Sequence, residues 1–288
     1  MTARLNPARL IAFQGEPGAY SDLACRQVFP RLTSLPCLAF EDAIGAVKRG
    51  RASLAMLPID NSVAGRVADI HHLLPESGLH IVGEHYQRVN HHLLAVKGAK
   101  LSDLKIVRSH VHALGQCRKM IRALGLKAEV VADTAGAAAA VAREGDKRVA
   151  AIASELAGKV YGLTSLKANI EDAAHNTTRF LIMAAKEKRA ANKGLVVTTF
   201  VFRVRNVPAA LYKALGGFAT AGINMTRLES YMIGGRFTAT QFYADVEAHP
   251  NERRLKLALD ELAFYTEELK ILGVYPGHKF RMDQSQVG

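Results

Sequence analysis

The stretch EDAAHNTTRFLIMAA (residues 171–185) changes character abruptly in its middle. Polar side chains fill residues 176–179 (Asn-Thr-Thr-Arg), and from Phe180 onward the chain is apolar. A short apolar run of this kind is typical of a buried strand. Threonine alone is common in strands, but an amide, two hydroxyls and a guanidinium together offer hydrogen-bond donors and a fixed positive charge. These residues therefore predict an anion-binding edge, suited to a carboxylate, at the start of a buried strand.

The chain before this stretch alternates short apolar runs with segments of helical periodicity. The apolar runs lie at residues 9–13, 35–40, 52–59, 104–109, 128–132 and 148–154. This alternation predicts an α/β fold with largely parallel sheets. It forms two similar lobes, residues 1–78 with 164–184 and residues 79–163, so the chain crosses between them twice. We therefore expect a bilobal domain over residues 1–184, with a ligand cleft beyond the carboxyl ends of its strands.

The pattern changes after a polar linker at residues 185–194. Residues 195–277 predict a strand, a helix, two strands, a helix and a strand, the ferredoxin-like βαββαβ order of a small separate domain. The two middle strands alternate with period two around Gly234-Gly235, which indicates a hairpin. Residues 278–288 are expected to be a mobile tail.

Composition and charge exclude several classes of protein. The chain has 288 residues, of which 49% are hydrophobic and 22% charged, as in ordinary globular proteins. Its net charge of +12 suits either a solvated basic surface or the attraction of small anionic substrates. No recognition motif accompanies this charge, so we expect no nucleic-acid partner. The apolar runs are too short for a membrane span and no signal-peptide pattern occurs, so we expect a cytoplasmic protein without a membrane partner.

Cysteine and histidine spacing gives no sign of a metal site. The three cysteines show no CxxC spacing, which argues against a disulfide framework or a zinc site. Neither an HExxH motif nor any other tight ligand spacing connects the histidines, which cluster at His71, His72, His80, His85, His91 and His92.

Three further segments place polar residues where strands end and helices begin. The turn at residues 15–18 is either a plain strand–helix connection or a loop whose backbone N–H groups face a ligand. Asn61 and Ser62 stand where a helix N-cap would lie, so they either cap a helix or contact a ligand. Ser109 ends a strand, and Gln116 follows two helical turns along the same face, so this pair could line a cleft.

Together these segments resemble the prephenate dehydratase family with a C-terminal ACT regulatory domain. The matching pieces are, in order, Phe13-x-Gly15-x-x-Gly18-Ala19-Tyr20-Ser21, Leu57-Pro58-Ile59-Asp60-Asn61-Ser62, Ser109-His110 with Gln116, and Asn176-Thr177-Thr178-Arg179-Phe180. The resemblance covers the whole chain and implies a bilobal domain like that of periplasmic binding proteins, followed by the ACT domain. It also implies a carbon–oxygen lyase that converts prephenate to phenylpyruvate, water and CO2 in L-phenylalanine biosynthesis, without a cofactor or metal.

The resemblance assigns roles to residues of the predicted cleft. Thr178 would donate a hydrogen bond to the departing hydroxyl, and Arg179 would hold a substrate carboxylate. The pyruvyl carboxylate is favoured, because stabilising a charge that vanishes in the transition state would raise the barrier. Asn61, Ser109 and Gln116 would orient the substrate as further catalytic residues. The substrate-binding residues implied are Asn176, Thr177, Ser62, His110, Phe180, Tyr20 and Ser21.

In the C-terminal domain the resemblance implies allosteric feedback by L-phenylalanine, with the domains paired in a homodimer or homotetramer. The effector-binding residues would be Ala209, Ala210, Leu211, Gly222, Asn224, Glu229 and Ser230. Two departures bear on this site: Ala209 replaces a family glycine, and Tyr231-Met232 replaces Arg-Pro. A purely structural dimerisation domain is the alternative.

Two alternative functions stay open. An arogenate dehydratase performs the same chemistry on a substrate whose side chain carries an amino group in place of the keto group, and it shares these motifs. A non-catalytic bilobal module that binds a solute or effector would use the same fold. We expect a signal peptide in a solute receptor and a DNA-binding helix-turn-helix in a regulator, and neither pattern occurs.

Overall fold

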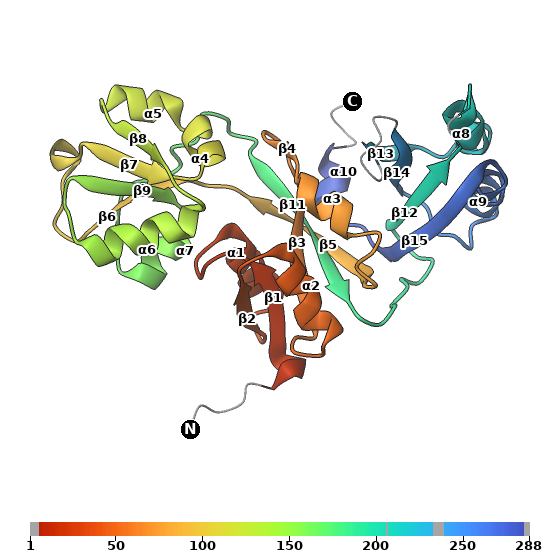
Figure 1. Cartoon of the computed structure of the whole chain (residues 1–288), viewed down its shortest axis with the longest axis horizontal. Coiled ribbons are helices and arrows are strands. Elements are labelled where there is room, and N and C mark those ends of the chain that lie inside the picture. Colours follow the sequence, from red (N-terminus) through yellow and green to blue (C-terminus); the bar gives the residue numbers. More distant parts are fainter. Residues whose placement is uncertain (1–5, 206, 233–238, 285–288) are drawn as a thin grey trace. The chain divides into compact units, whose positions relative to one another are not determined.

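The computed structural model describes residues 6–205, 207–232 and 239–284. Packing divides the chain into two units (Figure 1). Unit 1 holds the N-terminal stretch through Val67 together with Tyr86–Phe180, and unit 2 holds Ala68–His85 together with the stretch from Leu181 onward. Within the described ranges, no helix combines the length and the apolar character that a membrane span requires.

The first lobe of unit 1 is built on parallel strands. β1 (Leu10–Gln14) lies between β2 (Thr33–Cys37) and β3 (Leu54–Asn61) and runs parallel to both. β11 (Thr177–Ala184) lies on the other side of β3, begins in unit 1 and ends in unit 2. Four of the five residues of β1 are buried, as expected for a central strand. The remaining elements are the 3-10 helix η1 (Pro7–Arg9), α1 (Tyr20–Val28), α2 (Phe40–Lys48) and β4 (Gly65–Arg66).

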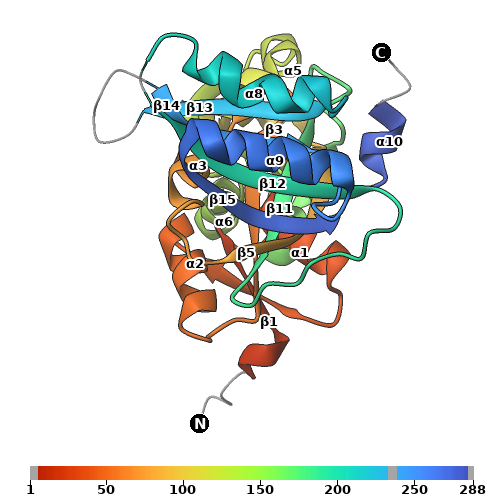
Figure 2. The same cartoon turned by 90° about the vertical axis from the view of Figure 1, so that its right-hand side faces the viewer.

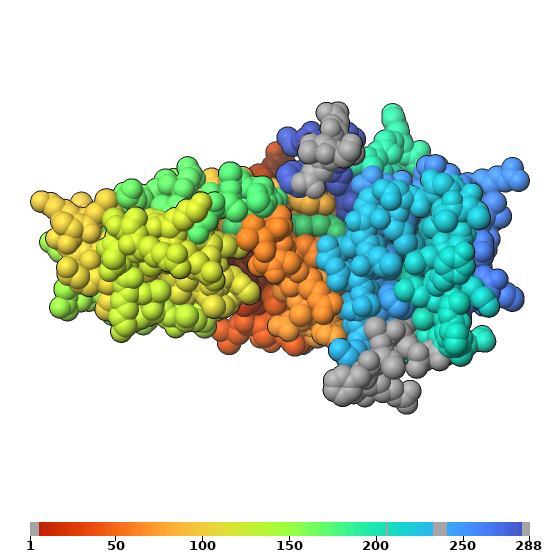
Figure 3. Space-filling model, turned by 90° about the horizontal axis from the view of Figure 1, so that it is seen from above, coloured from red at the N-terminus to blue at the C-terminus, as the bar shows by residue number. Residues whose placement is uncertain are grey.

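The second lobe of unit 1 is a five-stranded sheet in the order β10-β6-β9-β7-β8. Its central strand β9 is buried at all five positions, and separate apolar clusters pack on its two faces. Helices α4 and α5 lie at the surface of this lobe (yellow-green in Figure 3). The elements are β6 (His92–Ala95), η2 (Leu101–Asp103), β7 (Ile106–Ser109), α4 (Val111–Gln116), α5 (Arg118–Ala123), β8 (Lys127–Val130), α6 (Thr134–Glu144), β9 (Val149–Ala153), α7 (Glu155–Tyr161) and β10 (Thr164–Lys167).

Unit 2 contains the predicted βαββαβ arrangement. Its strands follow the order β13-β14-β12-β15, the ferredoxin-like order, and Figure 2 shows α8 and α9 side by side over one face of them. The predicted hairpin strands pair antiparallel, while the turn at Gly234-Gly235 lies outside the described residues. The elements are β12 (Val196–Val204), α8 (Ala210–Thr220), β13 (Met225–Met232), β14 (Ala239–Val246), α9 (Arg253–Tyr265) and β15 (Thr266–Pro276).

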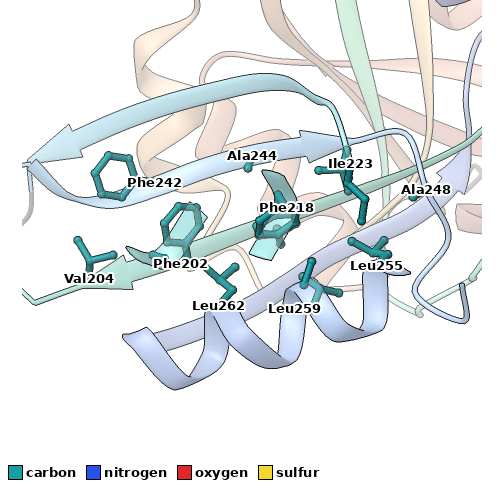
Figure 4. Close-up of a cluster of buried hydrophobic side chains, with 14 residues drawn as sticks. Phe202, Val204, Phe218, Ile223, Phe242, Ala244, Ala248, Leu255, Leu259 and Leu262 are labelled. Atoms are coloured by element: carbon teal, nitrogen blue, oxygen red, sulfur yellow. The ribbon is translucent and has the colours of Figure 1, made fainter. Parts of the chain in front are cut away.

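Four phenylalanine side chains lie among the aliphatic residues of the core between these strands and helices (Figure 4). The rings of Phe202 and Phe242 stack with their centroids 5.2 Å apart, and those of Phe200 and Phe218 stack at 5.8 Å. Stacked pairs of this kind contribute beyond their buried area. The order of the strands and helices confirms the α/β class and the ferredoxin-like arrangement that the sequence predicts.

The division into units differs from the domain boundary predicted at residue 184. α3 (Ala68–Leu73) and β5 (His80–Arg88) come from the first predicted domain, yet residues 68–85 pack within unit 2. β5 pairs with β15 where Gly273 meets Ile81, and a side chain at Gly273 would collide with the Ile81 carbonyl. The ring of His71 in α3 lies 5.2 Å from that of Tyr243. The contacts of β5 with β15 and of α3 with β14 join residues 68–85 to unit 2, and a change in sequence composition does not reveal such contacts.

The expectation of a mobile tail is wrong for α10 (Phe280–Gln284). Its Arg281 side chain is only 8% exposed and donates to both carboxylate oxygens of Glu84, at 2.6 and 3.0 Å. The same guanidinium lies 3.6 Å from the buried carboxylate of Asp245. Two buried carboxylates therefore share this cation, and removal of one partner from a buried charge group typically costs several kcal/mol.

Candidate functional site

The predicted anion-binding edge lies where β3 ends beside the start of β11. The two segments are joined by paired hydrogen bonds between Ser62 and Thr177. The Ser62 backbone N–H donates to the Thr177 carbonyl at 2.9 Å, and the Thr177 backbone N–H donates to the Ser62 hydroxyl at 2.9 Å. The Ser62 hydroxyl in turn donates to the His175 carbonyl at 2.8 Å. These bonds place Asn61 directly beside the Asn-Thr-Thr-Arg run.

The side chain of Asn61 is held in one orientation by the backbone that follows it. Its Oδ1 accepts hydrogen bonds from the backbone N–H groups of Val63 and Ala64, at 3.0 and 2.8 Å. The chain turns here into β4, so of the two alternatives for Asn61, a helix cap or a ligand contact, the helix cap is wrong. Since Oδ1 must face these two donors, Nδ2 must face the site as a donor.

A row of amide side chains begins at Asn61. Its Nδ2 donates to Asn176 Oδ1 at 2.8 Å, and Asn176 Nδ2 donates to Gln116 Oε1 at 2.8 Å. Asn176 is fully buried, so its two bonds within this row replace the water it has lost. The structure thus brings together three residues that lie far apart in the sequence, and each predicted amide takes part.

Thr178 lies beside this row as an acceptor. Asn61 Nδ2 donates to Thr178 Oγ1 at 3.0 Å, the hydroxyl's one hydrogen bond within the described part of the chain. A threonine hydroxyl has one hydrogen to donate and two lone pairs. Because Asn61 occupies the oxygen as a donor, the hydroxyl hydrogen of Thr178 is directed elsewhere. The hydrogen of the Thr178 hydroxyl therefore points away from Asn61.

Arg179 lies on the opposite face of β11 from Thr178, since successive side chains of a strand alternate. It is 6% exposed, and its guanidinium lies 4.0 Å from the carboxylate of Asp60 on β3. Asp60 and Asn61 alternate in the same way. The two neighbouring strands thus carry one matched pair on each face, Asn61 with Thr178 and Asp60 with Arg179. This placement does not favour Arg179 as a clamp on the molecule that Thr178 contacts.

The remaining residues predicted to line the cleft make hydrogen bonds or packing contacts within the protein. Ser109 is fully buried and donates to the Ile152 carbonyl at 2.6 Å, and His110 caps the N-terminus of α4. Ser21 and Phe180 are buried. In the turn at residues 15–18, the N–H of Gly18 donates to Asp22 and its carbonyl accepts from Ser154, so both of its backbone groups already have protein partners.

The predicted effector residues lie in unit 2 around α8. Ala209 precedes the helix with φ 62°, a left-handed conformation that favours glycine. Ala210 and Leu211 pack partly into the core, whereas Gly222, Asn224 and Ser230 are exposed. Glu229 accepts from Arg227 at 2.9 Å. Residues 209–211 lie at the start of the 11-residue helix α8 and residues 222–224 follow its end, about 16 Å away by helical rise, so one chain does not gather them into a single site.

His91 is a residue of this site that the sequence analysis did not select. It is 2% exposed, and its Nε2 lies 3.0 Å from Gln116 Oε1 at the far end of the amide row. Its Nδ1 lies 2.9 Å from the hydroxyl of Tyr20, which also lies 2.7 Å from the Asn90 carbonyl. Tyr20, predicted to bind substrate, therefore contacts His91. The one signal in the sequence was membership of the histidine cluster.

Within residues 6–205, 207–232 and 239–284, no group of three or more His, Cys, Asp or Glu side chains is placed to hold a metal ion. The amide row and Thr178 are uncharged hydrogen-bond donors and acceptors, a set suited to orienting a polar molecule.

Comparison with known proteins assigns the family. The sequence matches the family described as Prephenate dehydratase over residues 11–188, more than half of the chain. The chain belongs to the prephenate dehydratase family. The site residues Asn61, Gln116, Asn176 and Thr178 all fall inside the matched range.

The names of two relatives each combine prephenate dehydratase with a second activity. A Komagataeibacter europaeus protein named "Bifunctional N-acyl-homoserine lactone acylase/prephenate dehydratase" is 56% identical over 96% of this chain and 99% of its own. An Arabidopsis thaliana protein named "Arogenate dehydratase/prephenate dehydratase 2, chloroplastic" is 39% identical over 92% of this chain and 72% of its own.

Two solved structures show the same fold along nearly the whole chain. One, described as GqqA, a novel type of quorum quenching acylase, has a TM-score of 0.89 with 56% identity, over 95% of this chain and 100% of that one. The other is a prephenate dehydratase from Arthrobacter aurescens in complex with L-Phe. Its TM-score is 0.85 with 29% identity, over 93% of this chain and 89% of that one.

The Asp60–Arg179 pair yields a stability prediction. Arg179→Met removes the guanidinium beside a largely buried carboxylate, so we expect it to lower the free energy of unfolding by about 1–3 kcal/mol. Denaturant unfolding checks this. Arg148→Met is the matched control, because its pair with Asp146 is exposed and should change stability by about 0.5 kcal/mol or less. An Arg179→Met variant of unchanged stability but raised KM would instead identify a substrate clamp.

Proposed function

We propose that the chain is a prephenate dehydratase, which converts prephenate to phenylpyruvate, water and CO2 in L-phenylalanine biosynthesis. The observation that carries the proposal is the Thr178 hydroxyl, held as an acceptor by Asn61 so that its own hydrogen is directed to a bound molecule. Membership of the prephenate dehydratase family supports it.

The reaction needs little more than orientation and one hydrogen-bond donor. The bond between the ring and its carboxylate breaks, CO2 leaves, and the electron pair of that bond enters the ring. The C–O bond on the opposite ring carbon breaks at the same time, and the departing hydroxide takes a proton from solvent to become water. Formation of the aromatic ring drives both cleavages.

In this proposal Thr178 donates a hydrogen bond to the departing hydroxyl and keeps its own hydrogen. A threonine hydroxyl is far too weak an acid to be ionised near neutral pH, so its contribution is hydrogen-bond assistance as the C–O bond lengthens. Assistance of this kind typically increases a rate by about 10²- to 10⁴-fold. Asn61 and Asn176 hold the hydroxyl in place, and Gln116 continues the same row.

The geometry changes the role proposed for Arg179. With its guanidinium beside Asp60, we propose that Arg179 positions the strand that carries Thr178, and that the net charge of +12 attracts the dianionic substrate. Ser109 stays a predicted substrate-orienting residue, and Ser62, Thr177 and His110 stay predicted substrate-binding residues.

Replacement of Thr178 tests the catalytic step. Thr178→Val keeps the shape of the side chain but removes the hydroxyl, so we expect kcat to fall about a hundredfold or more. Thr178→Ser keeps the hydroxyl and is the matched control. Steady-state kinetics with prephenate measures both variants, and thermal unfolding monitors the fold. A Thr178→Val variant with near-normal kcat would remove Thr178 from the proposed step.

The substrate is tested by comparing kcat/KM of the purified chain for prephenate and for arogenate. We expect turnover of prephenate to exceed that of arogenate, and the reverse preference would assign an arogenate dehydratase. Binding of prephenate without release of CO2 would support a non-catalytic binding module instead. Arogenate belongs in the comparison because the Arabidopsis thaliana relative carries both names.

N-acyl-homoserine lactones form a second candidate class of substrate. The observation that favours them is the 56% identity to a relative whose name includes this acylase activity. Hydrolysis of the amide by water would release a fatty acid and homoserine lactone. Assay of the same preparations shows whether the chain has this activity, and loss of both activities in Thr178→Val would place them at one site.

We also propose that residues 195–277 form an ACT regulatory domain that binds L-phenylalanine between paired copies. The separation of residues 209–211 from residues 222–224 supports a shared site, because a second copy could bring opposite helix ends together. The L-Phe complex of the Arthrobacter aurescens relative supports the effector.

Titration with L-phenylalanine tests this regulation. We expect inhibition of prephenate turnover together with dimer or tetramer formation in analytical ultracentrifugation. Ala209→Gly removes a methyl group from a left-handed position, where a non-glycine residue costs on the order of 1 kcal/mol. Because the methyl group would also crowd an effector that approaches this backbone, we expect tighter inhibition in this variant. Activity and assembly that do not respond to L-phenylalanine would leave a purely structural domain.

A further inference from the structure

The amide row ends at a buried imidazole. His91 is 2% exposed and lies between the Gln116 carboxamide on its Nε2 side and the Tyr20 hydroxyl on its Nδ1 side. Its backbone N–H donates to Glu171 at 2.9 Å, and Glu171 in turn pairs with Arg88. The imidazole is thus held on both sides by side chains and at its backbone by a buried carboxylate.

Each link in the row determines the direction of the next. Two backbone N–H groups face Asn61 Oδ1, so Asn61 Nδ2 donates and Asn176 Oδ1 accepts. Asn176 Nδ2 therefore donates, and the atom of Gln116 that it meets is the carbonyl oxygen Oε1. An oxygen there makes a hydrogen bond with His91 Nε2 only when Nε2 carries a hydrogen.

We propose that His91 is a positioning residue for the dehydration reaction. Its Nε2–H anchors the Gln116 carboxamide at the far end of the row, and Asn176 connects that end to Asn61, which contacts the hydroxyl of Thr178. The inference rests on the proposed function, because the step that it supports is the donation by Thr178. His91 itself is separated from the reacting atoms by the amide row.

Both protonation states of His91 keep this hydrogen. The Tyr20 hydroxyl has a single hydrogen. In the charged state Nδ1 donates to Tyr20 and Tyr20 donates to the Asn90 carbonyl, whereas in the neutral state with the hydrogen on Nε2 the Tyr20 hydroxyl turns its hydrogen from the Asn90 carbonyl to Nδ1. Burial lowers the pKa of His91, whereas the hydrogen bond to Gln116 and the charge of Glu171 oppose this and His92 adds to it. Since Nε2–H persists in both states, kcat should not follow the titration of His91, as it would for a general base.

Two substitutions of His91 test the position of the hydrogen. His91→Leu removes the donor, and we expect kcat to fall about tenfold or more while KM changes by about twofold or less. His91→Gln can place an amide N–H near the Nε2 position, and we expect it to recover most of kcat. His92→Leu is the matched control, because that neighbouring side chain bonds to Ser165 outside the row. An unchanged kcat in a folded His91→Leu variant would overturn the proposal.

A double-mutant cycle with Gln116 separates positioning from general destabilisation. In a Gln116→Leu background the row is already broken, so His91→Leu should lower kcat little further. Thermal unfolding of all four proteins reports stability separately. Multiplicative losses of kcat in the double variant would show that His91 acts independently of the row and would overturn the proposal.

Nitrogen-15 NMR of the imidazole provides a test that does not require turnover. We expect a protonated Nε2 whose hydrogen exchanges slowly with solvent in the intact chain and quickly in Gln116→Leu. An unprotonated Nε2 in a chain that turns over prephenate would overturn this inference alone. A chain that turns over none of the tested substrates would overturn the proposed function, and the role of His91 in dehydration with it, even if the protected hydrogen is found.

Discussion

The site depends on two backbone N–H groups. Val63 and Ala64 donate to one oxygen of Asn61, and this leaves the amide with a single acceptable orientation. The orientation of Asn61 determines which atom donates and which accepts in each later hydrogen bond, from Thr178 at one end of the row to His91 at the other. The donors and acceptors of the three amides and of Thr178 are therefore fixed by hydrogen bonds alone, without a charged side chain among them.

The neighbouring strands β3 and β11 use their alternation to separate two tasks. On one face Asn61 and Thr178 form the polar site, and on the other Asp60 and Arg179 form a largely buried ion pair. A buried pair of opposite charges is sensitive to register, since a shift of one residue would place each charge on the wrong face. The ion pair thus favours the register that aligns Asn61 with Thr178.

Much of this arrangement was predictable from the sequence, because local patterns carry it. Period-two runs and turn residues indicated the strands, and Asn61, Gln116, Asn176 and Thr178 were selected from motifs. His91 was not, because its partner Gln116 is 25 residues away and joins it only in the folded chain. The strand pairing of Ile81 with Gly273 and the burial of Arg281 against Glu84 also depend on tertiary contacts that periodicity does not report.

A site whose hydrogen-bond donors are asparagine amides is sensitive to deamidation. Deamidation replaces an NH2 group with an oxygen, which preserves the shape of the side chain but turns a donor into an acceptor. At Asn176 the new carboxylate would face the carbonyl oxygen of Gln116, and at Asn61 it would face that of Asn176. Deamidation of Asn61 would thereby remove one of the hydrogens that its amide shares between Asn176 and Thr178.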